Sequence, residues 1–340
     1  MIKRLFALLL GLSLVATSAG CAQKTATGSA GIQVVCATAP LYDWTRQITK
    51  GTTSTEQKLI IGKGTDLHSF QPSAADIIAI KNADVLIYVG GESDGWIRDA
   101  LKETLNKDQK VVCLMDVLKD SIVEEEVVEG MQGEDEHDHE DHDHEDHDDH
   151  DDHDEHDEKD HHHEEGPEYD EHVWMSLRLA AKSCKAIEEA IASVAKADAS
   201  KFKANLDEYL SKLDALDKQY EEMVKGARLD TMVVADRYPF RYLAEDYKLK
   251  YSAAFVGCSA ETEASFETVK FLADKIKALD SKTILTIENS DGKIAKTVIE
   301  TSGKTDVKIE VLDSMQSCGD ELDYLSVMTG NLEKLKAALS

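Results

Sequence analysis

Residues 201–225 read KFKANLDEYLSKLDALDKQYEEMVK, and this stretch decides the architecture. Its apolar side chains recur at three- and four-residue steps with charged residues between them, which is typical of an amphipathic helix, and Gly226 supplies a stop. At 1.5 Å per residue the helix is about 37 Å long, enough to reach across two domains. A coiled-coil partner would also explain the pattern, but the repeat is too short to require one. We therefore predict one rigid linking helix over 201–226. Its apolar stripe comprises Leu206, Tyr209, Leu210, Leu213, Leu216, Tyr220, Met223 and Val224.

Short apolar runs alternate with helical patterns on both sides of this helix, which is typical of parallel sheets covered by helices. A chain of 340 residues also exceeds the usual size of a single core. We predict two Rossmann-like α/β lobes, 32–200 and 227–340, each with a parallel four-stranded sheet. The predicted strands are 33–37, 58–61, 85–89 and 111–115, then 232–235, 251–256, 283–287 and 307–312. The predicted helices are 41–49, 74–81 and 96–105, then 240–247, 266–278, 294–300 and 325–339.

Residues 134–165 contain only Asp, Glu and His apart from Lys159. A segment without apolar residues cannot offset its conformational entropy by burial, so we expect a disordered loop within the first lobe. Imidazole and carboxylate together form weak, exchangeable sites for divalent metals, although a solvated acidic run is the simpler alternative. The run holds 11 of the 13 histidines, which favours the metal hypothesis. These are His137, His139, His142, His144, His147, His150, His153, His156, His161, His162 and His163.

Residues 1–20 have the pattern of a signal peptide, with a basic start and an apolar run over 5–16 that is too short to span a membrane. Small residues precede Cys21, as in the bacterial lipobox, although Ser18 stands where leucine is more usual. We expect lipidation of Cys21 and an extracytoplasmic, membrane-anchored lipoprotein, with plain secretion as the alternative. Residues 21–31 are small and polar, as in a tether.

The formal net charge is −29, of which the run 134–165 contributes −19 from 20 acidic residues and one lysine. The remainder is still acidic and has no basic patch, which excludes nucleic acid as a partner. An anionic membrane would not attract this body either, so the lipid must provide the anchor.

Six cysteines are present without any CxxC spacing. With Cys21 assigned to lipid an odd number remains, which fits neither a zinc knuckle nor a disulfide framework. We expect mostly buried single thiols, and leave open whether Cys258 and Cys318 form a bridge.

Only His68 and His172 lie outside the acidic run. Ligands of open α/β sheets bind beyond the carboxyl ends of the strands, and His68 lies in the loop 62–72 that follows the predicted strand 58–61. His172 follows the acidic run directly. A lone histidine is more often structural than ligating, but two in a chain with a metal-binding run are better explained as a pair.

The segments around these histidines resemble one family, the zinc and manganese receptors of bacterial ABC importers. Residues 64–72, GTDLHSFQP, resemble its Gly-x-Asp-x-His-x-(Tyr/Phe)-x-Pro segment, and 170–174, DEHVW, its Asp-Pro-His-(Val/Ile/Ala)-Trp segment with Glu171 in place of proline. Residues 94–96, DGW, and the segment LDSM at 312–315 match two further motifs in family order. An acidic, His-rich insertion before the second histidine is typical of the zinc-specific members.

The resemblance implies two lobes joined by one long helix, with the metal held in the cleft by two histidines, a third His or Glu, and an acidic residue. His68 and His172 match the positions from the first lobe, and Asp313 matches the acidic position from the second. The third position departs from the family pattern, because residues 234–243, VADRYPFRYL, contain no histidine.

Asp236 is the nearest carboxylate to this third position, and Glu261 or Glu263 could serve instead. An internal salt bridge of Asp236 with Arg237 or Arg241 is an equally good explanation of that carboxylate. Two imidazoles and two carboxylates would close a tetrahedral zinc site, although the added oxygen ligands also suit manganese.

We predict a monomeric substrate-binding component that captures Zn²⁺ and delivers it to an ABC permease with its ATPase. The run 134–165 would collect metal and pass it to the cleft. The alternatives are a manganese receptor of the same type, and a metal-buffering surface protein or adhesin in which the run is the whole function. No His-Glu-x-x-His, Gly-x-Ser-x-Gly or glycine-rich phosphate loop occurs, so we do not expect an enzyme.

Overall fold

The computed structural model describes residues 31–133, 168–259 and 263–340. The predicted signal peptide, Cys21 and nearly all of the predicted tether lie outside these residues, as do the His-rich run and Glu261. None of the helices in the described ranges is long and apolar enough to cross a membrane.

The first lobe is built on a parallel sheet in the order β2-β1-β3-β4. Its central strand β3 is buried at every position, as expected where helices cover a sheet on both faces. The strands are β1 (Ile32–Cys36), β2 (Thr55–Leu59), β3 (Val85–Tyr88) and β4 (Lys110–Cys113). The helices are α1 (Ala39–Thr49), α2 (Ala74–Asn82), α3 (Trp96–Leu101), α4 (Leu114–Val117) and α5 (Leu177–Val194).

The second lobe repeats this plan, with a parallel sheet in the order β6-β5-β7-β8. The prediction of two α/β lobes with four-stranded parallel sheets is therefore confirmed. The strands are β5 (Thr231–Tyr238), β6 (Lys250–Val256), β7 (Thr283–Ile287) and β8 (Lys308–Leu312). The helices are α7 (Arg241–Tyr247), α8 (Phe266–Ala278), α9 (Lys293–Ser302) and α10 (Tyr324–Ala338).

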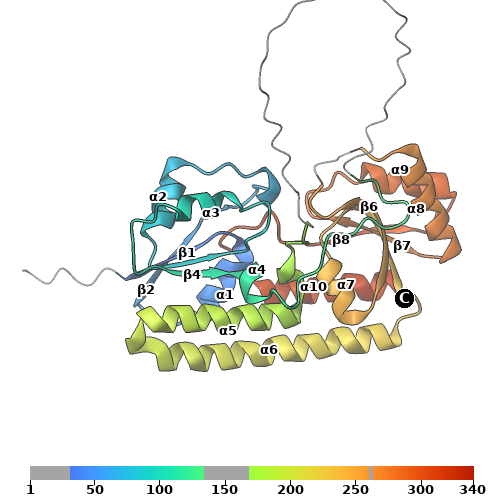
Figure 1. Ribbon diagram of the computed structural model, residues 1–340. Helices are drawn as coiled ribbons and strands as arrows, with labels where there is room; N and C mark the ends of the chain where they lie inside the picture. Colours follow the sequence, from blue (N-terminus) through green and yellow to red (C-terminus); the bar gives the residue numbers. More distant parts are fainter. Residues whose placement is uncertain (1–30, 134–167, 260–262) are drawn as a thin grey trace, which may run out of the picture. The chain divides into compact units, whose positions relative to one another are not determined.

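The linking helix is α6 (Ala199–Gly226), which begins two residues earlier than predicted. It packs against α1 and α5 of the first lobe and against α7 and α10 of the second, running beneath both sheets (Figure 1). Its predicted stripe is buried almost throughout, and the Tyr220 hydroxyl donates to the carbonyl oxygen of Met328 in α10 at 2.6 Å. The apolar spacing of one helix therefore joins the two lobes.

Most strands differ from their predicted limits by one or two residues, and β2 and β5 differ by three at one end. The prediction placed the second strand at 58–61, but β2 begins at Thr55 and ends at Leu59, because an edge strand that pairs only with β1 tolerates polar residues. Strand β5 continues to Tyr238 through an irregularity in its register between Val234 and Arg237. Asp236 therefore lies inside a strand and not in the loop after it.

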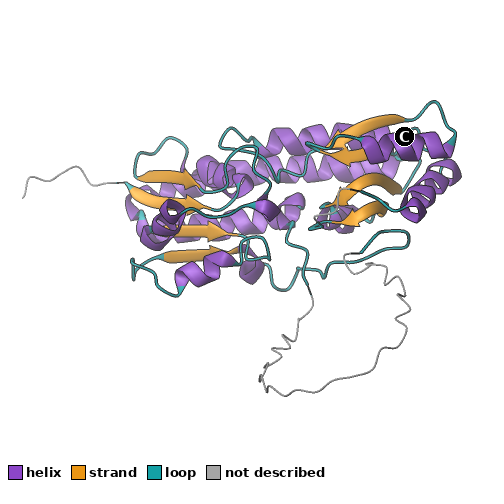
Figure 2. Ribbon diagram, turned by 90° about the horizontal axis from the view of Figure 1, so that it is seen from above, coloured by secondary structure: helices purple, strands orange, loops and turns teal. Residues whose placement is uncertain are grey.

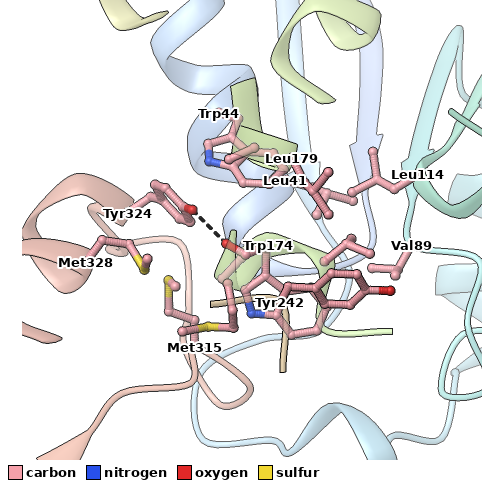
Figure 3. Close-up of a cluster of buried hydrophobic side chains, with 14 of the residues drawn as sticks. Leu41, Trp44, Val89, Leu114, Trp174, Leu179, Tyr242, Met315, Tyr324 and Met328 are labelled. Carbon is pink, nitrogen blue, oxygen red and sulfur yellow. Dashed lines mark hydrogen bonds between the residues drawn. The ribbon is translucent and has the colours of Figure 1, made fainter. Parts of the chain in front are cut away.

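Trp174 anchors the contact between the lobes (Figure 3). Its indole N–H donates to the carbonyl oxygen of Ser314 at 2.9 Å, and its own carbonyl oxygen accepts the hydroxyl of Tyr324 at 2.6 Å. Tyr324 in turn packs edge-on against Trp44 of α1, with ring centroids 5.2 Å apart. This buried cluster fixes the backbone next to His172 relative to both lobes.

All five cysteines in the described part of the chain are free. The predicted burial holds for Cys36, Cys113 and Cys184, whereas Cys258 and Cys318 are half-buried and unbridged. Cys258 comes two residues after β6, where the carboxyl end of a strand faces the cleft.

Candidate metal site

His68 is positioned by a short 3₁₀ turn (Leu67–Ser69) in the loop after β2. The carboxylate of Asp66 caps this turn by accepting the backbone N–H of His68 at 3.0 Å. Arg237 of the second lobe pairs with the other oxygen of Asp66 at 2.7 Å, so an ion pair that crosses the cleft holds this loop.

His172 is fully buried and precedes a second 3₁₀ turn (Val173–Met175). It repeats the arrangement of His68, because the Asp two residues earlier, Asp170, accepts its backbone N–H at 2.8 Å. The same Asp170 oxygen lies 3.0 Å from Nδ1 of the His172 ring. Each Asp-x-His segment therefore aims its histidine through a side-chain hydrogen bond to its own backbone.

The rings of the two histidines face each other with their Nε2 atoms 3.3 Å apart. Their Nδ1 atoms point to hydrogen-bond partners: His172 to Asp170, and His68 to the Ser93 hydroxyl at 2.6 Å and the Glu171 carboxylate at 3.3 Å. The Ser93 hydroxyl donates to Glu171, so it accepts Nδ1–H of His68. Protons held at both Nδ1 atoms leave both Nε2 lone pairs free to bind one ion.

This spacing fits tetrahedral zinc. Two nitrogens that each lie about 2.05 Å from a tetrahedral zinc ion are about 3.3 Å from one another. Both imidazoles already have carboxylates behind them, the arrangement that raises the basicity of a ligating histidine and fixes its orientation.

The two imidazoles differ in proton affinity. Burial lowers the pKa of His68 to about 3, and the neighbouring His172 adds to this effect. Burial also opposes a proton on His172, but the Asp170 carboxylate beside its ring outweighs it and raises its pKa. Of the two rings, His172 is therefore the one with the higher proton affinity.

Gln316 places its side-chain amide against both imidazoles. Its Nε2 lies 2.8 Å from Nε2 of His68 and 2.6 Å from Nε2 of His172, and because an amide nitrogen can only donate, both imidazoles accept. Its Oε1 accepts the Ser314 hydroxyl at 3.0 Å. Glu288 holds this loop by accepting the backbone N–H groups of Ser314 and Gln316 at 2.7 and 3.1 Å.

Four side chains in the described residues lie close enough together to share one metal ion. His68, Glu171, His172 and Cys258 each offer one ligand atom, and these atoms all lie within 4.8 Å of one another. The two predicted histidines belong to this group, whereas Glu171 and Cys258 were missed. The only sequence signal at Glu171 is that it replaces the proline of the family segment. The sequence pattern predicts only a structural or bridging thiol for Cys258. Its position just after a predicted strand, where ligands of α/β sheets bind, is the signal that could have indicated a ligand.

The predicted acidic residues lie around this group but not in it. Asp236 lines, together with His68, a cavity of about 640 Å³, and its carboxylate accepts the backbone N–H of Arg237 at 3.0 Å. Asp313 follows β8 and accepts the backbone N–H of Met315 at 2.8 Å. Burial raises the pKa of both carboxyl groups. Glu263 is exposed.

The alternative explanation of Asp236, a salt bridge with Arg237 or Arg241, is wrong for the described residues. Arg237 pairs with Asp66, and Arg241 pairs with Glu126 at 2.6 Å. Asp236 is instead held by hydrogen bonds, among them the one from the backbone N–H of Arg237, and the Arg237 guanidinium acts on it only as a nearby charge.

The two lobes, the helix behind them and the imidazole pair define a two-lobed α/β binding protein with a candidate metal site between the lobes. The chain belongs to the family described as zinc-uptake complex component A, periplasmic, whose model matches residues 34–338. The resemblance stated from the sequence motifs is thereby confirmed.

Relatives within and around this family carry names that refer to zinc. The chain is 32% identical over 344 residues to the zinc-binding lipoprotein AdcA of Streptococcus pneumoniae, and the match covers 98% of this chain but only 60% of AdcA. It is 29% identical over 331 residues to the high-affinity zinc uptake system protein ZnuA of Bacillus subtilis, covering 94% of this chain and 93% of that protein.

Solved structures agree with this assignment. The Zn(II)-bound ZnuA-like domain of S. pneumoniae AdcA superimposes with a TM-score of 0.67 at 25% identity, over 91% of this chain and 99% of that one. A laminin-binding adhesin of Streptococcus agalactiae gives a TM-score of 0.68 over 91% of this chain and 100% of that one, but at 22% identity it shows the fold alone. The adhesin alternative therefore gains no support from it.

Proposed function

We propose that this protein captures a zinc ion between its lobes and delivers it to the permease of an ABC importer that is driven by its ATPase. One observation carries the proposal: two buried or half-buried imidazoles with anchored Nδ1 atoms present their Nε2 atoms 3.3 Å apart. Such a pair suits zinc better than manganese, which prefers oxygen ligands. The protein acts as a binding protein and not as an enzyme.

His68 and His172 supply the ligands from the first lobe. Asp236 and Asp313, with Glu261 or Glu263 as alternatives to Asp236, remain the oxygen ligands proposed for the second lobe. Asp236 lies within β5 and Asp313 directly follows β8, both in the second sheet. Figure 2 shows the strands of the two lobes as two separate groups.

The remaining parts of the proposal concern residues outside the described ranges. The run 134–165 collects zinc at many weak sites and raises its effective concentration near the cleft. Lipid on Cys21 anchors a monomeric receptor outside the cytoplasm.

Calorimetric titration of zinc and of manganese tests this function. The mature chain is titrated with and without residues 134–165, beside a His68→Ala, His172→Ala variant of each form. We expect one tight zinc site that survives removal of the run and vanishes in the double variant. Loss of tight binding with the run alone would instead support a metal-buffering protein, and a cleft that prefers manganese would change the substrate.

A further inference from the structure

We infer that Cys258 is the third zinc ligand and the residue that makes the cleft select zinc over manganese. This inference rests on the proposed function, because it assigns a role within the same site. The sequence pattern predicts Asp236, Glu261 or Glu263 at the third position. Among the described residues, however, the second lobe contributes only Cys258 to the group of ligand atoms that lie within 4.8 Å of one another.

The backbone around Cys258 brings its thiol to the histidines. Gly257 directly follows β6 and lies against His172. A Cβ at this position would lie 3.0 Å from Cε1 and 3.1 Å from Nδ1 of the His172 ring. It would also lie 3.1 Å from the carbonyl oxygen of Tyr238. A larger residue would have to push these neighbours away, so glycine favours this close approach, and the next residue is Cys258.

A segment that precedes the His-rich run holds Cys258 in this position. The backbone N–H of Cys258 donates to the carboxylate of Glu125 at 3.3 Å. The same segment bonds to β6 itself, because the backbone N–H of Gln132 donates to the carbonyl oxygen of Ala254 at 2.9 Å, and Gln132 forms a bridge with Phe255. The backbone of Cys258 is thus held against the segment that precedes the His-rich run.

Among the described residues, the neighbouring strand β5 brings no side chain into the group of four ligand side chains. Arg237, near the end of β5, points its guanidinium group at Asp66 and so places a cation beside the loop of His68. Asp236 of the same strand lines the cavity beside His68 but does not belong to this group. The thiol of Cys258 reaches the group from the segment after β6, and the ion pair of Arg237 with Asp66 stays intact.

A thiolate changes which metal the site prefers. Thiolate is a soft ligand that binds zinc at about 2.3 Å, whereas manganese prefers carboxylate and water. On binding, the S–H bond of Cys258 breaks, a sulfur–zinc bond forms and one proton passes to solvent, without oxidation or reduction. With two imidazoles and one thiolate, the site has the nitrogen and sulfur ligands that are typical of zinc.

Cobalt(II) reports directly on this thiolate, because cobalt–sulfur bonds give a charge-transfer absorption in the near ultraviolet that cobalt–imidazole and cobalt–carboxylate bonds lack. The run 134–165 contains no cysteine and can be retained, and the chain is started at Ala22 to omit the thiol of Cys21. Cys258→Ser is the test variant, and Cys318→Ser, at the other half-buried thiol, is the matched control. We expect the absorption in the parent chain and in Cys318→Ser, and its absence in Cys258→Ser.

Affinity measurements complete the test. Zinc affinity should fall about 100-fold in Cys258→Ser, since loss of an outer partner of a metal ligand already costs 10- to 100-fold, while manganese affinity should change much less. If Cys258→Ser does not fold, zinc should still protect Cys258 of the parent chain from iodoacetamide, as located by peptide mapping, while Cys318 stays reactive.

Two failures are distinguishable. Tight cobalt and zinc binding without the charge-transfer absorption, or without protection of Cys258, overturns the thiolate assignment and leaves the receptor function intact. Zinc binding that does not depend on His68 and His172 overturns the proposed function itself.

Discussion

Replacing Gln316 by alanine should tighten zinc binding, although Gln316 touches both histidines. The amide of Gln316 donates to Nε2 of His68 and of His172 at 2.8 and 2.6 Å, the lone pairs that a zinc ion needs. Zinc binding must therefore break both hydrogen bonds. A buried neutral hydrogen bond contributes about 0.5–1.5 kcal/mol net, so the two together oppose binding by about 1–3 kcal/mol.

Gln316→Ala removes this competition. We expect zinc affinity to rise between about 5- and 150-fold, since 1.4 kcal/mol corresponds to a tenfold change in an equilibrium constant. The same change should lower the free energy of unfolding of the metal-free protein by about 1–3 kcal/mol, because the amide also bonds across the lobes. Gln219→Ala, on the exposed face of α6, is the matched control and should alter neither quantity.

Competition against a chromogenic zinc chelator measures the affinity, and thermal unfolding with and without zinc measures the stability. A fall in zinc affinity of Gln316→Ala would refute the reasoning. Such a fall would mean that the side-chain amide of Gln316 rotates by about 180° and binds the ion through Oε1. Gln316 would then be a zinc ligand and not a competitor for the imidazole lone pairs.

Three further predictions concern the same cleft. Asp170→Asn removes the carboxylate behind Nδ1 of His172 and should lower zinc affinity about 10- to 100-fold in chelator competition, with near-wild-type folding; an unchanged affinity would show that the tautomer is fixed by other means. Because His172 binds zinc only when it is deprotonated and its pKa is raised, affinity should be full above that pKa and fall below it. As the pH is lowered from 8 to 5.5, zinc binding should come to release one additional proton per ion and not two, because His68, with a pKa of about 3, is neutral throughout this range. The slope of log affinity against pH measures this number. Gly257→Ala should destabilise the protein by about 1–3 kcal/mol in thermal unfolding, because the added Cβ meets the His172 ring and the carbonyl oxygen of Tyr238; a variant as stable as the parent would show that the strand end can shift.

The sequence determined the architecture because its signals are local and repeated. The apolar stripe of 201–225 predicted the linking helix to within two residues at its start, since helix periodicity depends only on neighbours along the chain. The alternation of buried runs and amphipathic patterns predicted both parallel sheets. It misplaced β2, because the polar residues of an edge strand carry little apolar signal.

The two histidines could also be found from sequence, since they stand in Asp-x-His segments and are the only histidines outside the run. Their partners could not. Only the fold brings Glu171 and Ser93 together beside Nδ1 of His68. Gln316 contacts both rings although it lies more than 140 residues away along the chain.

Cys258 shows the same limit from the other lobe. No spacing in the sequence relates it to His68 or His172, and its approach depends on the close packing of Gly257 and on the hydrogen bond to Glu125. The sequence by itself determined the lobes, their linking helix and the imidazole pair. Which side chains complete the site was decided only by the tertiary structure, because a metal ion is bound by atoms that converge in space from strand ends distant in the chain.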